Sequence, residues 1–322
     1  MQEIVNQDAV KDVPALSRAF NAGDPFRHVL IQDFLTDSFL EAILREFPQP
    51  APEDMRSEFG RRSRKHAVHD ITAIGPVFRR WDATLRSPEF IGMLEQITGI
   101  DKLLHDPEYH GAGTHNNMNG QGMDVHIDFN LHRTTGYHRR LNLIIYLGPE
   151  WNPDWGGNLE LHKDPWDREN DYFKSYPPFR NHAVLFETNE HSWHGFDNIR
   201  LPDDKQDVSR KSLTVYYYTK TRPEEERARK HGTIYVQKAI PDSVQPNEVL
   251  TPGAYRELEQ IFKRRDNYLK GLYTRESNLL VRVEDLKFRV RQLEKRLESG
   301  ADPQPGSIVS RIRRALGPGR KP

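Results

Sequence analysis

The sequence contains no cysteine, has no net charge and carries no long hydrophobic run. Without cysteine, a disulfide scaffold, a thiolate zinc site, an iron–sulfur cluster and a cysteine nucleophile are all excluded. The 47 Lys and Arg balance 47 Asp and Glu, which excludes a globally basic protein that attracts nucleic acid through its net charge. The most apolar run, residues 143–147, is far shorter than the roughly 18 residues that cross a bilayer. The first ten residues, MQEIVNQDAV, lack a basic start and an apolar stretch, so we expect no signal peptide and a cytoplasmic protein.

Length and composition are those of a folded chain with two unlike parts. The 322 residues suffice for one large domain or for two domains of about 150 residues each, and 36% hydrophobic content excludes disorder throughout. Residues 251–322 hold 17 Lys and Arg against 9 Asp and Glu, whereas 10 of the 14 histidines lie between His105 and His194. These counts predict a histidine-rich body followed by a basic tail.

The first hundred residues predict mixed secondary structure. Residues 28–31 are typical of a strand. In residues 36–47 apolar side chains recur at helical spacing, and Ser38 with Glu41 fits a capping box at the start of the helix. A second amphipathic helix is predicted over residues 88–104.

Between about residues 105 and 220 the sequence consists of short runs of residues that favour β-strands. Gly, Pro, Asn and Asp clusters separate these runs, and so dense a series of short strands favours a sandwich or barrel over alternating βα units. The predicted strands are Met123–Asp128, Leu141–Leu147, Asn158–Leu161, Ala183–Thr188 and Ser212–Thr219. We therefore expect a mainly β protein with flanking helices.

The C-terminal part predicts a coiled coil. Apolar residues step alternately by four and three positions, with charged residues filling most of the remaining positions: Leu279, Val283, Leu286, Val290, Leu293 and Leu297. This heptad pattern predicts a homo-oligomer, at least a dimer, joined through residues 268–297. The basic segment after it, residues 301–322, is a candidate for weak contact with an anionic membrane or a partner.

One histidine and one carboxylate converge in the predicted strand 123–128. His126 and Asp128 are two positions apart, so their side chains point to the same face of the strand. His194, just after the strand 183–188, is the candidate third ligand, with His191 as its rival. Two histidines and one carboxylate form the facial triad of non-haem Fe(II) sites. A structural hydrogen-bonded cluster and a zinc site are the alternatives.

Arg210 adds a second element to this site. It begins the predicted strand 210–216, in which Arg210, Ser212, Thr214 and Tyr216 share one face. A buried guanidinium beside an iron site is suited to hold a ligand carboxylate as a bidentate, charge-assisted pair. The co-substrate 2-oxoglutarate needs such a cation for the carboxylate that does not bind the iron.

Residues 105–222 resemble the 2-oxoglutarate/Fe(II)-dependent dioxygenase superfamily, in its prolyl-4-hydroxylase-like branch. The matching blocks are residues 126–129, 139–147, 155–161, 192–195 and 210–218. The resemblance implies a double-stranded β-helix (jelly-roll) core and iron bound by His126, Asp128 and His194. It also implies that Arg210 binds the distal carboxylate of 2-oxoglutarate, with hydrogen bonds from Tyr146 and Ser212.

The resemblance further implies hydroxylation of a substrate with Fe(2+), 2-oxoglutarate and O2, releasing succinate and CO2, with ascorbate as a candidate reductant. Residues 114–122 lack the tyrosine that prolyl hydroxylases often have there, so a prolyl peptide, a glycan-related molecule and a small molecule all stay open as substrates. A non-catalytic jelly-roll and coiled-coil scaffold, or a zinc-dependent cupin-like enzyme, are the alternative functions. No nucleic-acid partner is expected.

These patterns divide the chain into four predicted parts. Residues 1–104 form a helical and strand support region of the dioxygenase domain, and residues 105–240 its jelly-roll catalytic core. A linker and the coiled coil follow over residues 241–300, and residues 301–322 are a flexible basic tail that is suited to peripheral membrane association.

Overall fold

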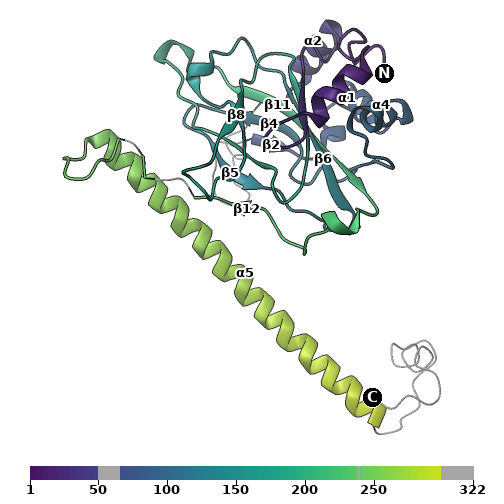
Figure 1. The fold of residues 1–322 in the computed structure, drawn as a ribbon, viewed down its shortest axis with the longest axis vertical. Helices are drawn as coiled ribbons and strands as arrows, with labels where there is room; N and C mark the ends of the chain where they lie inside the picture. The colour runs from purple at the N-terminus through teal and green to yellow at the C-terminus, as the bar shows by residue number, and fades with distance from the viewer. Residues whose placement is uncertain (50–65, 238–239, 242, 299–322) are drawn as a thin grey trace. The chain divides into compact units, whose positions relative to one another are not determined.

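The computed structural model describes residues 1–49, 66–237, 240–241 and 243–298. The chain divides into two compact units, Met1–Lys238 and Ala239–Pro322 (Figure 1). The predicted basic tail, residues 301–322, lies outside the described residues. No helix in the described part of the chain is both long enough and apolar enough to cross a membrane.

The first unit contains two antiparallel sheets. The seven-stranded sheet has the order β1-β9-β6-β11-β4-β2, with β3 paired to β11, and the five-stranded sheet has the order β12-β5-β10-β7-β8. The strands of the larger sheet are β1 (His28–Ile31), β2 (His66–Val68), β3 (Leu104–His105), β4 (Gly113–Asn117), β6 (His138–Tyr146), β9 (Ala183–Glu187) and β11 (Arg210–Thr219). Those of the smaller sheet are β5 (Met123–Ile127), β7 (Leu159–His162), β8 (Phe173–Tyr176), β10 (Trp193–Phe196) and β12 (Ile234–Tyr235).

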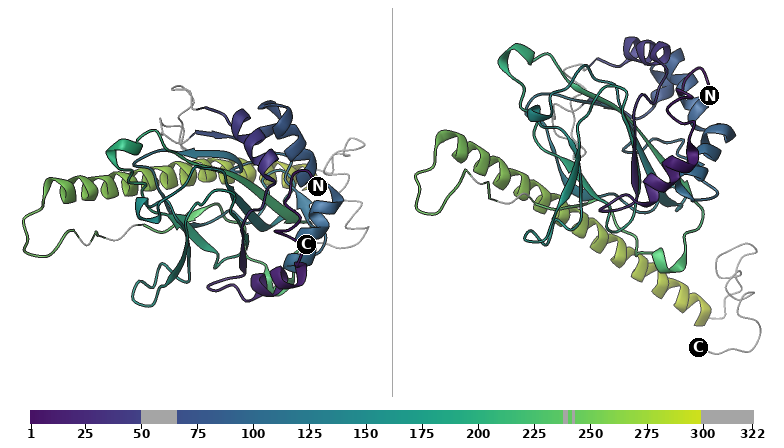
Figure 2. Two further views of the ribbon diagram at one scale, coloured as in Figure 1. Left: turned by 90° about the horizontal axis from the view of Figure 1, so that it is seen from above. Right: turned by 45° about the horizontal axis from the view of Figure 1, so that its top comes forward.

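Strands that are distant in sequence are neighbours in both sheets, as in a jelly roll. Figure 2 shows the strands of the two sheets facing each other, with the helices of the first hundred residues gathered on one side. These helices are α1 (Val13–Asn21), α2 (Asp37–Glu46), α3 (Pro76–Leu85) and α4 (Pro88–Thr98). The described loops also contain the 3₁₀ helices η1 (Ile71–Ala73), η2 (Pro153–Trp155), η3 (Asp203–Lys205) and η4 (Glu224–Glu226). The prediction of a mainly β fold with flanking helices and a jelly-roll core is confirmed.

The period of two along β6 and β11 gives the larger sheet two different faces. Leu143 of β6 and Leu213 of β11 are buried in the same apolar cluster as Trp81 of α3 and Phe90 of α4. This cluster is the main hydrophobic core, and its packing holds the larger sheet in place against helices α3 and α4. The alternate residues of the same strands point to the opposite face, which carries the polar groups described below.

Two helix boundaries differ from the sequence predictions. Helix α2 is capped by Thr36, whose side-chain oxygen accepts a hydrogen bond from the Phe39 amide, so the capping box predicted at Ser38 is wrong. Glu41, the other residue of that box, forms an ion pair with Arg180. Helix α4 ends at Thr98 and not at residue 104, because Gly99 adopts a left-handed conformation with φ of 69° that terminates the helix.

The second unit contains the long helix α5 (Pro252–Glu298), which confirms a C-terminal helix over the segment where the coiled coil is predicted. The Thr251 hydroxyl accepts a hydrogen bond from the Ala254 amide at its start. Its association with another chain stays a prediction.

Candidate metal and co-substrate site

The smaller sheet brings together the three predicted ligands. His126 lies on β5 and Asp128 directly follows that strand, and His194 of β10 is the register partner of His126. Directly paired residues of antiparallel strands point to the same face. One ligand atom from each of the three residues lies within 4.8 Å of the others, and within the described residues this is the one group of three or more such side chains. The Asp128 carboxylate oxygens are 3.7 Å from His126 Nε2 and 3.4 Å from His194 Nε2.

Backbone carbonyls orient both imidazoles for metal binding. His126 Nδ1 lies 2.9 Å from the carbonyl oxygen of Asp124, and His194 Nδ1 lies 2.8 Å from that of Ser192. Since a carbonyl only accepts, each Nδ1 carries a proton, and Nε2 is the ring nitrogen of each histidine that faces Asp128. Burial, with a further contribution from His126, lowers the pKa of His194 to about 4, so this ring is neutral at physiological pH. Two imidazoles and a carboxylate are a donor set that fits Fe(II).

Arg139 holds the carboxylate of this group in place, a role that the sequence analysis missed. Its guanidinium donates to Asp128 Oδ2 at 2.7 Å, and its side chain is fully buried. The guanidinium carbon lies 3.4 Å from the centre of the Tyr216 ring and 4.8 Å from that of Phe129. The ion pair and the two rings thus fix the orientation of Asp128. The signal available in the sequence was an arginine at the start of a buried strand.

Arg210 and Tyr146 meet on the inner face of the larger sheet. Arg210 is 4% exposed, and it donates from Nε to the Gly157 carbonyl at 2.7 Å and from Nη2 to the Tyr146 hydroxyl at 3.2 Å. Burial lowers the pKa of this guanidinium. No carboxylate pairs with Arg210 among the residues that the structure describes, although buried charges are normally paired.

The aromatic ring of Phe196 connects Arg210 to the three ligands. The guanidinium carbon of Arg210 lies 4.1 Å from the centre of this ring. Phe196 follows His194 by two positions on β10, and it therefore lies on the same face as that ligand, about 7 Å along the strand. Arg210 therefore contacts the strand that carries His194.

Strand register adds further polar groups to the same face. Ser212, 2% exposed, pairs with Tyr146 on one side and with His115 on the other, and Asn117 pairs with Arg210. The side chains of His115 and Asn117 therefore point to the Arg210 side of the sheet. The sequence analysis placed both only in the segment before the first ligand, because their polar composition does not indicate a buried strand. His191, the rival ligand, is exposed and is not part of the ligand group.

Comparison with known proteins agrees with this geometry. Residues 112–218, which include all the predicted site residues, match the model of the 2OG-Fe(II) oxygenase superfamily. A search of curated proteins found no match.

Similar solved structures include several prolyl hydroxylases. One, from Trichoplax adhaerens in complex with a hypoxia inducible factor peptide fragment, is 16% identical over 68% of this chain and 96% of its own, with a TM-score of 0.45. A prolyl-4-hydroxylase from Pseudomonas putida is 14% identical over 65% and 96%, with a TM-score of 0.41. A prolyl 4-hydroxylase from Phytophthora capsici is 17% identical over 71% and 73%, with a TM-score of 0.46. The match of residues 112–218 to the 2OG-Fe(II) oxygenase superfamily model contains the ligand group, and together they indicate that the protein is a dioxygenase that uses Fe(2+), 2-oxoglutarate and O2.

Proposed function

We propose that the protein hydroxylates an organic substrate and converts 2-oxoglutarate to succinate and CO2. When bound, iron and 2-oxoglutarate supply the activation of O2 and the oxidising power for the hydroxylation. The residues of this chain bind and orient these groups and keep the site buried. The observation that carries the proposal is the buried Arg210, which has no carboxylate partner among the described residues and contacts the ring two positions beyond His194.

In this proposal His126, Asp128 and His194 bind the iron. The two Nδ1–H groups donate to backbone carbonyls, which keeps both Nε2 atoms free of protons and aimed at the metal. Arg139 donates to one carboxylate oxygen of Asp128 and keeps that side chain from rotating away.

Arg210 binds the distal carboxylate of 2-oxoglutarate as the charge-assisted partner that this buried cation requires. Burial raises the pKa of the Tyr146 phenol, so its hydroxyl stays protonated and is able to donate to the same carboxylate. Ser212, opposite Tyr146 in the strand register, supplies a further hydroxyl on that face.

Anaerobic spectroscopy tests the assignment of the iron site. Fe(II) and then 2-oxoglutarate are added to metal-free protein, and the visible charge-transfer band of the iron–oxoacid chelate is followed. We expect a band that saturates with 2-oxoglutarate and is lost in His126→Ala and Asp128→Ala. His191→Ala is the matched control, because this exposed histidine lies three positions before His194 and outside the ligand group.

The outcome separates the alternatives. If wild-type protein binds iron but develops no band, or if His126→Ala keeps the full band, the proposed site is wrong. Once the band is established, prolyl peptides, glycan-related molecules and small molecules are tested in turn. The class that raises succinate formation above the rate without substrate is the substrate class.

A further inference from the structure

Helix α5 carries an apolar seam that is longer than the segment 268–297 of the sequence analysis, and most of its described side chains are exposed. Its residues recur at two alternating heptad positions: Tyr255, Leu258, Phe262, Leu269, Leu272, Leu279, Val283, Leu286, Val290, Leu293 and Leu297. Tyr255, Leu272 and Leu279 are 59%, 58% and 62% exposed. A seam this regular is built to pack against another helix with the same repeat.

The seam residues favour a second copy of the helix as the occupant. Apolar residues occupy both heptad positions. Position d holds Leu258, Leu272, Leu279, Leu286 and Leu293, and position a holds Tyr255, Phe262, Leu269, Val283, Val290 and Leu297. A second copy of this chain supplies exactly the complementary repeat, so the pair is a homodimer.

Two charged residues interrupt the seam and decide the direction of the second helix. Arg265 takes a d position between Phe262 and Leu269, and Glu276 takes an a position between Leu272 and Leu279. In a parallel dimer in register, each of these residues faces its own copy. That arrangement places two like charges together at two layers of the seam, which is unfavourable.

We propose that α5 forms an antiparallel two-stranded coiled coil in which Arg265 faces the partner's Glu276, and Glu276 faces the partner's Arg265. In antiparallel packing a positions face d positions, and one register alone brings these opposite charges together. The same register places Leu269 against the partner's Leu272 and Phe262 against the partner's Leu279. In this register residues 252–289 of the two helices overlap, about 55 Å at 1.5 Å per residue, and the seam residues Val290, Leu293 and Leu297 lie beyond the overlap.

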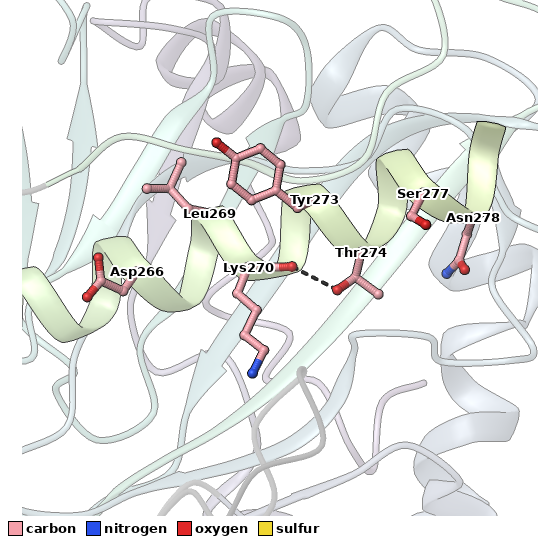
Figure 3. Close-up of a pocket in the computed structure, with 7 residues that line it drawn as sticks. All are labelled: Asp266, Leu269, Lys270, Tyr273, Thr274, Ser277 and Asn278. Atoms are coloured by element: carbon pink, nitrogen blue, oxygen red, sulfur yellow. Dashed lines mark hydrogen bonds between the residues drawn. The ribbon is translucent and has the colours of Figure 1, made fainter.

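The flanks of the seam agree with this direction. In the antiparallel register Asp266 lies beside the partner's Tyr273, a carboxylate beside a hydroxyl. Figure 3 shows the middle of α5, where Leu269 and Tyr273 project to the same side of the helix. In a parallel dimer Arg282 lies beside the partner's Lys287, another pair of like charges. The inference concerns α5 alone and is independent of the proposed hydroxylation.

Disulfide trapping in the full chain tests the register. The chain has no cysteine, so introduced thiols have no native competitor. On mild oxidation Leu279→Cys alone is expected to give no covalent dimer, because the two copies are about 25 Å apart along the helices, beyond disulfide range. A subunit-exchanged mixture of Leu279→Cys and Phe262→Cys is expected to give a covalent heterodimer. Efficient self-linking of Leu279→Cys, with no heterodimer, overturns the antiparallel register.

A charge exchange tests the pairing without cysteines. Arg265→Glu and Glu276→Arg are each expected to raise the dimer dissociation constant by about tenfold or more in sedimentation equilibrium, and the double variant is expected to restore it. Arg256→Glu, the same change off the seam, is the matched control and leaves the constant within about twofold. A double variant as weak as either single one, or a wild-type chain that stays monomeric, overturns the proposal. Oxygenase activity per site is expected to stay the same in all four variants.

Discussion

Replacing Arg210 by methionine tests whether this residue binds 2-oxoglutarate. Methionine keeps the apolar stem against Phe196 but removes the charge and the hydrogen bonds to Gly157 and Tyr146. Because Arg210 is only 4% exposed, the carboxylate of the co-substrate loses its partner at a site that water barely reaches. Breaking a buried ion pair costs about 3–5 kcal/mol. At about 1.4 kcal/mol per factor of ten, 2-oxoglutarate binding is expected to weaken roughly 10²- to 10³-fold.

Anaerobic titration of the Fe(II)-loaded protein with 2-oxoglutarate measures this change through the charge-transfer band. Lys211→Met is the matched control: Lys211 is the next residue of β11, points to the opposite face and bonds the Ser209 hydroxyl at 2.7 Å. Its 2-oxoglutarate affinity is expected to match that of wild type. Fe(II) affinity is expected to stay the same in both variants. A 2-oxoglutarate affinity of Arg210→Met within a factor of about three of wild type would refute the assignment.

Three further predictions concern the ligand carboxylate, the strand pairing and the pH dependence of stability. Arg139→Met leaves Asp128 without its buried partner, so we expect about 3–5 kcal/mol lower stability in urea and Fe(II) affinity lower by about 10- to 100-fold; unchanged metal affinity contradicts the role of Arg139. In Gly195→Ala the new Cβ would lie 2.9 Å from Val125 Cα and would push β10 away from β5. We therefore expect a lower Tm and weaker Fe(II) binding. An unchanged Tm would argue against this close packing of the two strands. Burial lowers the pKa of His105 to about 4, so the unfolded chain binds the proton first as the pH falls below about 6.5. The free energy of unfolding of the wild type then falls by up to about 3 kcal/mol between pH 6.5 and 4. The His105→Gln variant is expected not to show this decrease when both proteins are unfolded in urea across that pH range.

The ligand set was accessible from the sequence because its signals are local. The spacing of His126 and Asp128 on a strand places both side chains on one face whatever the rest of the fold does. The same period of two along β11 predicts that Arg210 and Ser212 share a face, and the regular register of β11 with β4 agrees. The heptad pattern of α5 is local in the same sense, since helix geometry alone places its apolar residues in one row.

Other features depend on pairings between segments that are distant in the chain. Arg139 is one of two consecutive arginines in the sequence, and nothing local shows that its guanidinium contacts Asp128 and the Tyr216 ring. Asn117 belongs to a polar segment that does not resemble a strand, yet β4 pairs with β11 and places it opposite Arg210. The start of helix α2 was also not predictable from local sequence. Thr36 and Ser38 are both good N-cap residues, and tertiary packing selects Thr36.

The sequence by itself determined which chemical groups the site contains, two imidazoles, a carboxylate and a cation, and where each lies along its own strand. These properties follow from residue identity and from the period of the local backbone. Only the tertiary structure decided that His194 pairs with His126, that Arg139 supports Asp128 and that Phe196 connects Arg210 to the ligands. The physical reason is that cross-strand register is set by packing of the whole jelly roll, in which a shift of one residue would turn every ligand to the other face of its sheet.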